Sequence, residues 1–81
     1  MIHKYMIGAS WCCNCRALKN TAELLGYEYI DTDNDCSNAV ERFNIKVLPT
    51  FVVTDEGTPI GILEQPSTNE ELLKFTNRFL Q

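Results

Sequence analysis

The stretch that decides the fold of this chain is Ser10-Trp11-Cys12-Cys13-Asn14-Cys15, which opens a segment with helical periodicity. Apolar residues recur at helical spacing after it and Gly26 is a typical stop, so we expect a helix over Cys13–Leu25. Cys12 and Cys15 are three residues apart and therefore lie on one face of its first turn. Two thiols at this spacing can close a disulfide or hold a metal ion.

The segments around this helix alternate between strand and helix patterns. Asp55-Glu56-Gly57 predicts a hairpin turn, Ser37 or Asn38 is a candidate helix cap, and Ser67-Thr68-Asn69-Glu70 matches a capping box. The further expected elements are strands over Ile2–Ile7, Tyr27–Asp31, Thr50–Thr54 and Thr58–Leu63, a short helix carrying Ala39, Val40 and Phe43, and a last helix with Leu72, Phe75 and Phe79 inward.

This element order, βαβαββα, predicts an α/β fold in a single domain over residues 1–81. The first βαβ unit requires a right-handed parallel crossover, whereas the final hairpin must be antiparallel. One mixed four-stranded sheet flanked by three helices satisfies both conditions. The active edge should be formed by the carboxyl ends of the two parallel strands, and Cys12 lies just past the first of them.

The composition excludes several classes of partner. The formal net charge is −4, the sequence pI is about 4.8 and the basic residues are scattered singly, so we expect neither nucleic acid nor a membrane as partner. The N-terminus shows no basic leader followed by a long apolar segment, and no stretch approaches transmembrane length. Four cysteines without an export signal predict reactive or metal-binding thiols in a reducing, cytoplasmic environment.

The Cys12–Cys15 pair is suited to thiol–disulfide exchange. The attacking species must be a thiolate, and a helix N-terminus stabilises one through its unpaired N–H groups and positive dipole end. Cys12 would attack a substrate disulfide, and Cys15, one turn further in and less exposed, would resolve the mixed disulfide. Half of a zinc site, or two thiols packed in the core, are the alternative interpretations.

The second motif is Val47-Leu48-Pro49-Thr50 at the mouth of the strongest strand. Pro49 cannot donate a hydrogen bond to a neighbouring strand. It is either an ordinary trans proline at a strand start or a cis proline that turns the backbone toward solvent. In the second case an extended substrate peptide can pair with the backbone there.

Together, Trp11-Cys12-x-x-Cys15, Ile30-Asp31, the run Phe43–Thr50 and Asp55-Glu56-Gly57 resemble the thioredoxin family over almost the whole chain. The resemblance is to a short form with a glutaredoxin-like core and implies a thioredoxin-like fold. It implies that Cys12 is the nucleophile, Cys15 the resolving thiol and Pro49 a cis proline. Trp11 would flank the substrate groove, the Leu48 backbone would contact substrate, and Cys13 and Asn14 would complete the binding surface.

Three departures from the family pattern bear on the chemistry. Cys13-Asn14 stands where thioredoxins have Gly-Pro, which affects the redox potential. Met6 stands where thioredoxins have a buried Asp, so the usual proton acceptor for the resolving thiol is missing. Asp31 is a candidate to lie near the thiols and act in proton transfer. Residues 63–67 replace the Gly-Gly and Asp of the glutaredoxin glutathione site, which favours protein-to-protein exchange.

The two further cysteines leave alternatives open. Cys13 should face solvent as a free thiol. Cys36, in the loop after the second strand, is either an auxiliary thiol at the active edge or a buried small hydrophobe. Tyr27 and Tyr29 are interpreted as sheet packing.

We therefore expect a monomeric, dithiol oxidoreductase that reduces disulfides in protein substrates, with ribonucleotide reductase as one candidate acceptor of its electrons. A thioredoxin-reductase-type enzyme or glutathione would recharge it, and the exchange requires no cofactor and no metal. The alternatives are a metal or iron–sulfur module using the four cysteines, a glutathione-dependent glutaredoxin-type activity, and an idle adaptor that keeps only the fold.

Overall fold

A computed structural model describes residues 1–34 and 38–79. The element order is the predicted βαβαββα, with a short 3₁₀ turn at Thr32–Asn34 after the second strand. Most strand and helix ends lie within one residue of their expected positions. The elements are β1 (Ile2–Gly8), α1 (Cys13–Leu24), β2 (Glu28–Asp31), α2 (Ala39–Arg42), β3 (Thr50–Asp55), β4 (Thr58–Glu64) and α3 (Asn69–Asn77).

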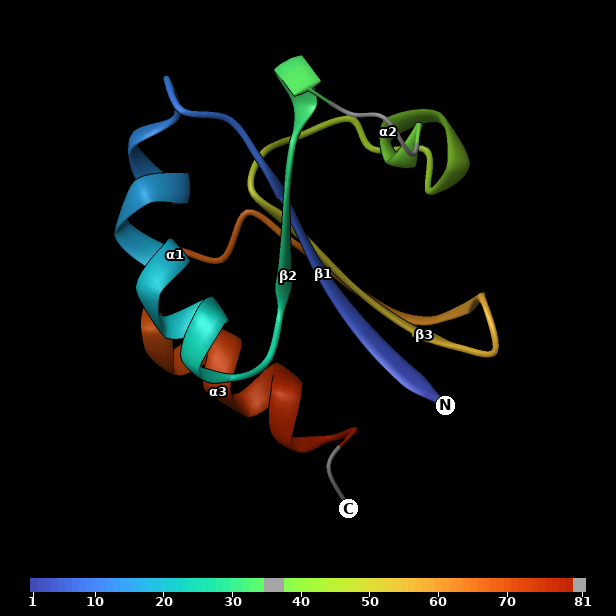
Figure 1. The fold of residues 1–81 in the computed structure, drawn as a ribbon. Helices are drawn as coiled ribbons and strands as arrows, with labels where there is room; N and C mark the ends of the chain where they lie inside the picture. Colours follow the sequence, from blue (N-terminus) through green and yellow to red (C-terminus); the bar gives the residue numbers. More distant parts are fainter. Residues whose placement is uncertain (35–37, 80–81) are drawn as a thin grey trace.

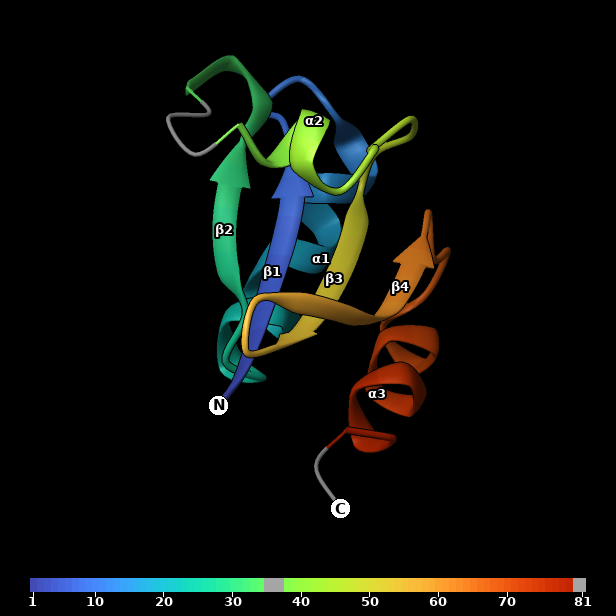
Figure 2. The same ribbon diagram turned by 90° about the vertical axis from the view of Figure 1, so that its right-hand side faces the viewer.

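The strands form one mixed sheet in the order β2-β1-β3-β4. β1 and β2 are parallel, whereas β3 runs antiparallel to both β1 and β4. Helices α1 and α3 cover one face of the sheet and α2 lies on the other (Figures 1 and 2). The predicted fold class, a mixed four-stranded sheet flanked by three helices, is confirmed.

The core has a larger layer under α1 and α3 and a smaller one under α2. Phe51, Val53 and Leu72 are fully buried in the larger layer, and burial of each such side chain contributes about 1.5–3 kcal/mol. The Tyr27 ring meets Phe51 edge-on, and its hydroxyl shares a 2.9 Å hydrogen bond with Thr76 Oγ1. Tyr27, just before β2, therefore links the start of that strand to α3, in agreement with its interpretation as a packing residue.

The turns that bound these elements follow from local backbone chemistry. Gly26 has a φ of +89° directly after the C-cap of α1, a conformation that a side chain would disfavour. Glu56 and Gly57 both have positive φ, as a tight two-residue hairpin loop requires. Asn38 precedes α2, and its carbonyl accepts the Arg42 N–H at 2.9 Å. The alternative cap, Ser37, lies outside the described residues.

The capping box of α3 is displaced by one residue from its expected position. Thr68, rather than Ser67, is the N-cap, and its hydroxyl accepts the Glu71 N–H at 3.2 Å. The Glu71 carboxylate in turn accepts the Ser67 N–H at 3.0 Å. Glu70 points away and pairs with Lys74 at 3.3 Å. Both Ser67 and Thr68 have an acidic residue three positions on, so the sequence pattern alone fitted either residue.

The expected inward face of α3 is present in Leu72 and Phe75, while Phe79 lies just beyond the end of the helix. The Phe79 ring still packs against Phe75, with 5.1 Å between centroids. Among the described residues, none of the helices is both long enough and apolar enough to cross a membrane.

Candidate thiol–disulfide site

The two sequence motifs meet at one edge of the sheet. β1 ends at Gly8, which pairs with Asp31 at the end of the parallel strand β2. Ala9, Ser10 and Trp11 then lead directly into α1. The start of α1, which carries Cys12 and Cys15, therefore lies at the carboxyl ends of the parallel strands, where the order of the elements predicted the active edge. The chain passes from the end of β1 into α1 at this edge (Figure 1).

Cys12 is the N-cap of α1. Its backbone is extended, with φ −90° and ψ 114°, and its Sγ accepts the Cys15 N–H at 3.3 Å. The sulfur therefore lies at the positive end of the helix with a backbone N–H directed at it. Cys12 is half-buried, whereas Cys15 is only 1% exposed, and both are free thiols. One sulfur of the pair is thus open to a substrate and the other is shielded.

The shielding has an electrostatic consequence for Cys15. Burial, reinforced by the hydrogen bond to Cys12 and by the charge there, raises the pKa of the Cys15 thiol from 9.0 to about 12. Cys15 is therefore a protonated thiol at neutral pH. Before it can attack another sulfur, it must give up that proton.

Met6 offers no acceptor for this proton. It is completely buried in the same apolar cluster as Cys15, on the strand that leads to the motif. A thioether carries no ionisable group, so any acceptor must come from another element.

Gly8 is a functional residue that the sequence reasoning missed. A methyl group there would lie 3.0 Å from Cys15 Sγ and 3.2 Å from Cε2 of Tyr29. Its bare backbone lets Cys15 and the Tyr29 ring pack against the end of β1. A glycine at the end of a strand, four residues before the first cysteine, was the available signal.

Pro49 is buried, and the Leu48–Pro49 peptide bond is cis, the isomer that the resemblance implied. Gln65, which the sequence reasoning also missed, holds this loop from the end of β4. Its N–H donates to the Pro49 carbonyl at 2.8 Å and its side-chain amide donates to the Leu48 carbonyl at 3.3 Å. Leu48 is half-buried and packs against both core layers.

Four neighbouring residues form what we call the outer rim: Trp11, Cys12, Cys13 and Asn14. The Trp11 side chain is 68% exposed, although large aromatic side chains are usually buried. Cys13 and Asn14 are exposed as expected, and the Arg16 guanidinium donates to Cys13 Sγ over 3.6 Å. The rim is therefore an amphipathic surface with a thiol at its centre. Cys36 lies outside the described residues.

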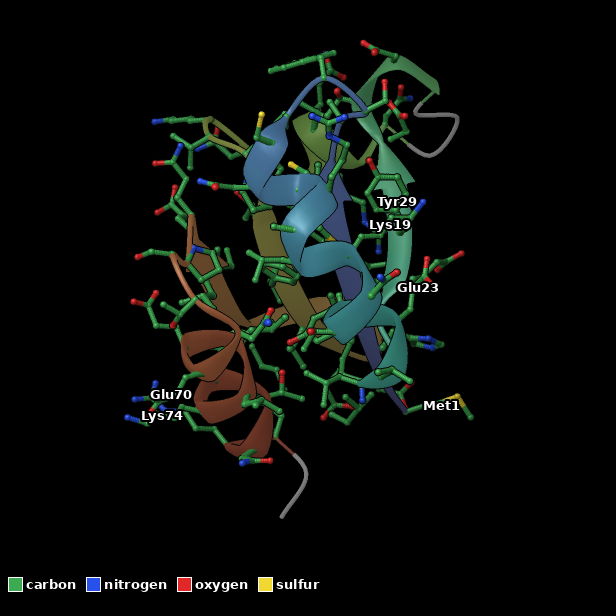
Figure 3. All side chains as sticks on the ribbon, turned by 90° about the vertical axis from the view of Figure 1, so that its left-hand side faces the viewer. Met1, Lys19, Glu23, Tyr29, Glu70 and Lys74 are labelled. Carbon is green, nitrogen blue, oxygen red and sulfur yellow. The ribbon has the colours of Figure 1, made fainter. Side chains whose placement is uncertain are left out.

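On the inner side of Cys15 lies a pocket of about 220 Å³, which we call the inner pocket. The Lys19 ammonium lies over the Tyr29 ring, 4.6 Å from its centroid (Figure 3). Burial and the nearby charges of Asp31, Cys15 and Cys12 raise the pKa of the Tyr29 hydroxyl. Tyr29 therefore does more than pack in the sheet, because it also lines the pocket beside Cys15. The pocket is lined by Ser10, Cys15, Arg16, Lys19, Tyr29 and Asp31.

The metal-binding alternative finds no support among the residues that the structure describes. Residues 1–34 and 38–79 contain no group of three or more His, Cys, Asp or Glu side chains placed to hold a metal ion.

The family to which the chain belongs follows from its sequence. The thioredoxin family model matches residues 5–78, nearly the whole length. The chain therefore belongs to the thioredoxin family, a family of thiol–disulfide oxidoreductases. Among curated proteins, none matches the chain significantly.

Solved structures show the same fold at low sequence identity. Thioredoxin from Fasciola hepatica is 20% identical with a TM-score of 0.82, over 95% of this chain and 79% of that one. Oxidised thioredoxin from Plasmodium falciparum is 21% identical with a TM-score of 0.82, over 99% and 82%. A thioredoxin f2 complex with ferredoxin:thioredoxin reductase gives 16% identity and a TM-score of 0.84, over 99% and 78%.

Proposed function

We propose that this protein reduces disulfide bonds in other proteins through Cys12 and Cys15. The observation that carries the proposal is the asymmetry of the pair. Cys12 caps a helix, accepts an N–H at 3.3 Å and is partly exposed, while Cys15 is buried and protonated beside it. An accessible nucleophile with a shielded second thiol is the arrangement that a two-step exchange requires.

In the first step, the Cys12 thiolate attacks one sulfur of the substrate disulfide. The other substrate sulfur leaves as a thiolate and takes up a proton. In the second step, Cys15 loses its proton and attacks Cys12 Sγ. The bond between Cys12 and the substrate breaks, and the second substrate sulfur leaves. The substrate gains two electrons and two protons, and a Cys12–Cys15 disulfide remains.

The surface around Cys12 supports a polypeptide substrate. Trp11, Cys13 and Asn14 are exposed beside the nucleophile, and an aromatic ring with a polar edge suits contact with a peptide. A hollow of about 600 Å³ also borders Val47 and Leu48. A substrate segment would contact the Leu48 backbone next to Pro49 by pairing as an added strand.

The oxidised pair must be reduced again before the next cycle. A thioredoxin-reductase-type enzyme is the partner we favour, since one structural relative was solved in complex with ferredoxin:thioredoxin reductase. Glutathione is the second candidate reductant. We further propose a monomer acting in the cytoplasm, with ribonucleotide reductase among the candidate substrates.

The test is a redox titration. The protein is equilibrated in graded glutathione buffers, its thiols are trapped by alkylation, and the products are mapped by mass spectrometry. We expect one two-electron transition in a Cys12–Cys15 disulfide, and its midpoint gives the direction of exchange. If Cys12 and Cys15 never pair, or react only after a chelator is added, the proposal fails in favour of a metal-binding module. A stable glutathione adduct on Cys12 would instead favour glutaredoxin-type activity.

A further inference from the structure

The second step of the proposed exchange requires a proton acceptor. Cys15 is 1% exposed, and its pKa is raised to about 12. Bulk water and hydroxide have poor access to it, and Met6 on β1 carries no base. The acceptor must therefore reach Cys15 from another side.

The inner pocket is the polar space that borders Cys15. Its volume of about 220 Å³ has room for several water molecules, since each occupies about 30 Å³ in the liquid. Side chains with hydrogen-bonding groups line it from the β1–α1 loop, from α1 and from β2, which are the partners that ordered water needs.

The charged and titratable groups that face this pocket differ in their ability to accept a proton. Arg16 and Lys19, both from α1, have side chains that donate hydrogen bonds and offer no acceptor. The raised pKa of Tyr29 keeps its hydroxyl protonated, so it can donate or relay but not accept without first losing its own proton. Asp31, at the end of β2, is the one carboxylate among the pocket-lining residues that the structure describes.

Asp31 is held at the pocket by its own turn. The Asp33 N–H donates to Asp31 Oδ1 at 2.9 Å, which leaves the other carboxylate oxygen outside that bond. Asp31 is half-buried, so it reaches both the pocket and bulk solvent. Because Asp31 pairs with Gly8 in the sheet, the strand register fixes it beside the start of the motif.

We propose that Asp31 accepts the Cys15 proton through water in the inner pocket as Cys15 attacks Cys12; this inference rests on the proposed two-step exchange. The S–H bond of Cys15 breaks, its electron pair forms the Cys15–Cys12 bond, and the Cys12–substrate bond breaks. The proton passes to the Asp31 carboxylate and from there to solvent. Lys19 and Tyr29 form part of the polar pocket lining along which the proton moves.

The experiment separates the two chemical steps in the full-length reduced protein. In stopped flow with 5,5′-dithiobis(2-nitrobenzoate), Cys12 attack releases the first thionitrobenzoate in a bimolecular phase. Cys15 attack releases the second in a phase that is independent of concentration. The phase that disappears in Cys15→Ser is the resolving step.

Asp31→Asn is the informative variant because its amide oxygen can still accept the Asp33 N–H. We expect the resolving step to slow about tenfold at pH 7, with the first phase unchanged within about twofold. We also expect its rate to rise about tenfold per pH unit, because hydroxide then has to replace the carboxylate. The wild-type rate should change less steeply with pH.

Glu28→Gln is the matched control, because it removes the same charge from the other end of β2 and from a position that does not line the pocket. It should keep both the wild-type resolving rate and the wild-type pH profile. If Asp31→Asn resolves as fast as Glu28→Gln, or keeps the wild-type pH profile, Asp31 is not the acceptor. If the wild type shows no concentration-independent phase at all, the proposed exchange itself fails.

Discussion

The outer rim and the inner pocket share the Cys12–Cys15 turn but are built differently. The rim is one continuous stretch of chain, Trp11–Asn14, at the start of α1. The inner pocket joins side chains from α1 with Tyr29 and Asp31 of β2, which the parallel pairing of β1 and β2 brings alongside. Exposure makes the rim accessible to a substrate, whereas burial means that Cys15 needs a proton acceptor before it can react. Substitutions can change the accessibility of the rim or the proton transfer from Cys15 separately.

Removing the rim nucleophile should have the largest effect. Cys12→Ser should lower the rate of protein-disulfide reduction about a thousandfold or more, because no other thiol caps the helix. Cys15→Ser is the matched variant: it should keep the first attack and accumulate a mixed disulfide on Cys12. Insulin reduction and mass spectrometry of the trapped adduct measure the two effects. Residual turnover by Cys12→Ser above that level would assign the nucleophile to another cysteine.

The burial of Cys15 should make the reduced protein sensitive to alkali. Its folded-state pKa is raised from 9.0 to about 12, so the unfolded chain loses this proton first as pH rises. The resulting stability is fully present below pH 9 and is lost as pH rises toward 12, with a limiting slope of about 1.4 kcal/mol per pH unit.

Urea unfolding of the reduced protein between pH 8 and about pH 10.5 measures this loss. Cys15→Ala is the reference, because it keeps Tyr27 and Tyr29, whose pKa values are also raised. The free energy of unfolding of the wild type should fall more steeply than that of Cys15→Ala. Parallel curves would mean that the Cys15 proton is not linked to folding.

Gly8→Ala should disturb the contact between the turn and the sheet. The new methyl group would lie 3.0 Å from Cys15 Sγ, closer than ordinary packing allows, so the turn or the Tyr29 ring must shift. We expect a loss of about 1–3 kcal/mol in the free energy of unfolding and a slower resolving step. Ala17→Ser, on the exposed side of α1, should change stability by no more than about 0.5 kcal/mol. A neutral Gly8→Ala would show that the close contact relaxes at little cost.

Trp11→Ala should affect recognition more than folding. The side chain is 68% exposed, so stability should change by about 0.5 kcal/mol or less. The KM for a protein disulfide should rise about tenfold, while the rate with a small aromatic disulfide should change little. Equal losses on both substrates would point to an effect on Cys12 itself rather than on substrate binding.

The element order and most boundaries could be predicted because they depend on local patterns. The β-branched run of β3, the Glu56-Gly57 turn and the Gly26 stop each encode their conformation within a few residues. The capping box of α3 was misplaced by one residue, since Ser67 and Thr68 satisfied the same pattern. Pro49 alone left both isomers open, and only the family resemblance favoured cis.

The inner side of the site could not be predicted in the same way. Gly8 and Gln65 carry little signal by themselves, and their importance comes from what packs against them. Tyr29 was interpreted as sheet packing, whereas the fold also places it beside Cys15 and Lys19. Asp31 was a candidate for proton transfer near the thiols from the sequence, but only the strand register placed it at the pocket that Cys15 borders.

The sequence by itself determined the two thiols on one helical turn, the aromatic residue before them and the order of strands and helices. These features depend on hydrogen bonds and periodicity within a few consecutive residues. The tertiary structure decided that Cys15 is buried and protonated and that Asp31 lines the same pocket as Cys15. Burial and proximity arise only when β1, β2 and α1 pack together, and the pKa of a thiol depends on that environment rather than on its neighbours in sequence.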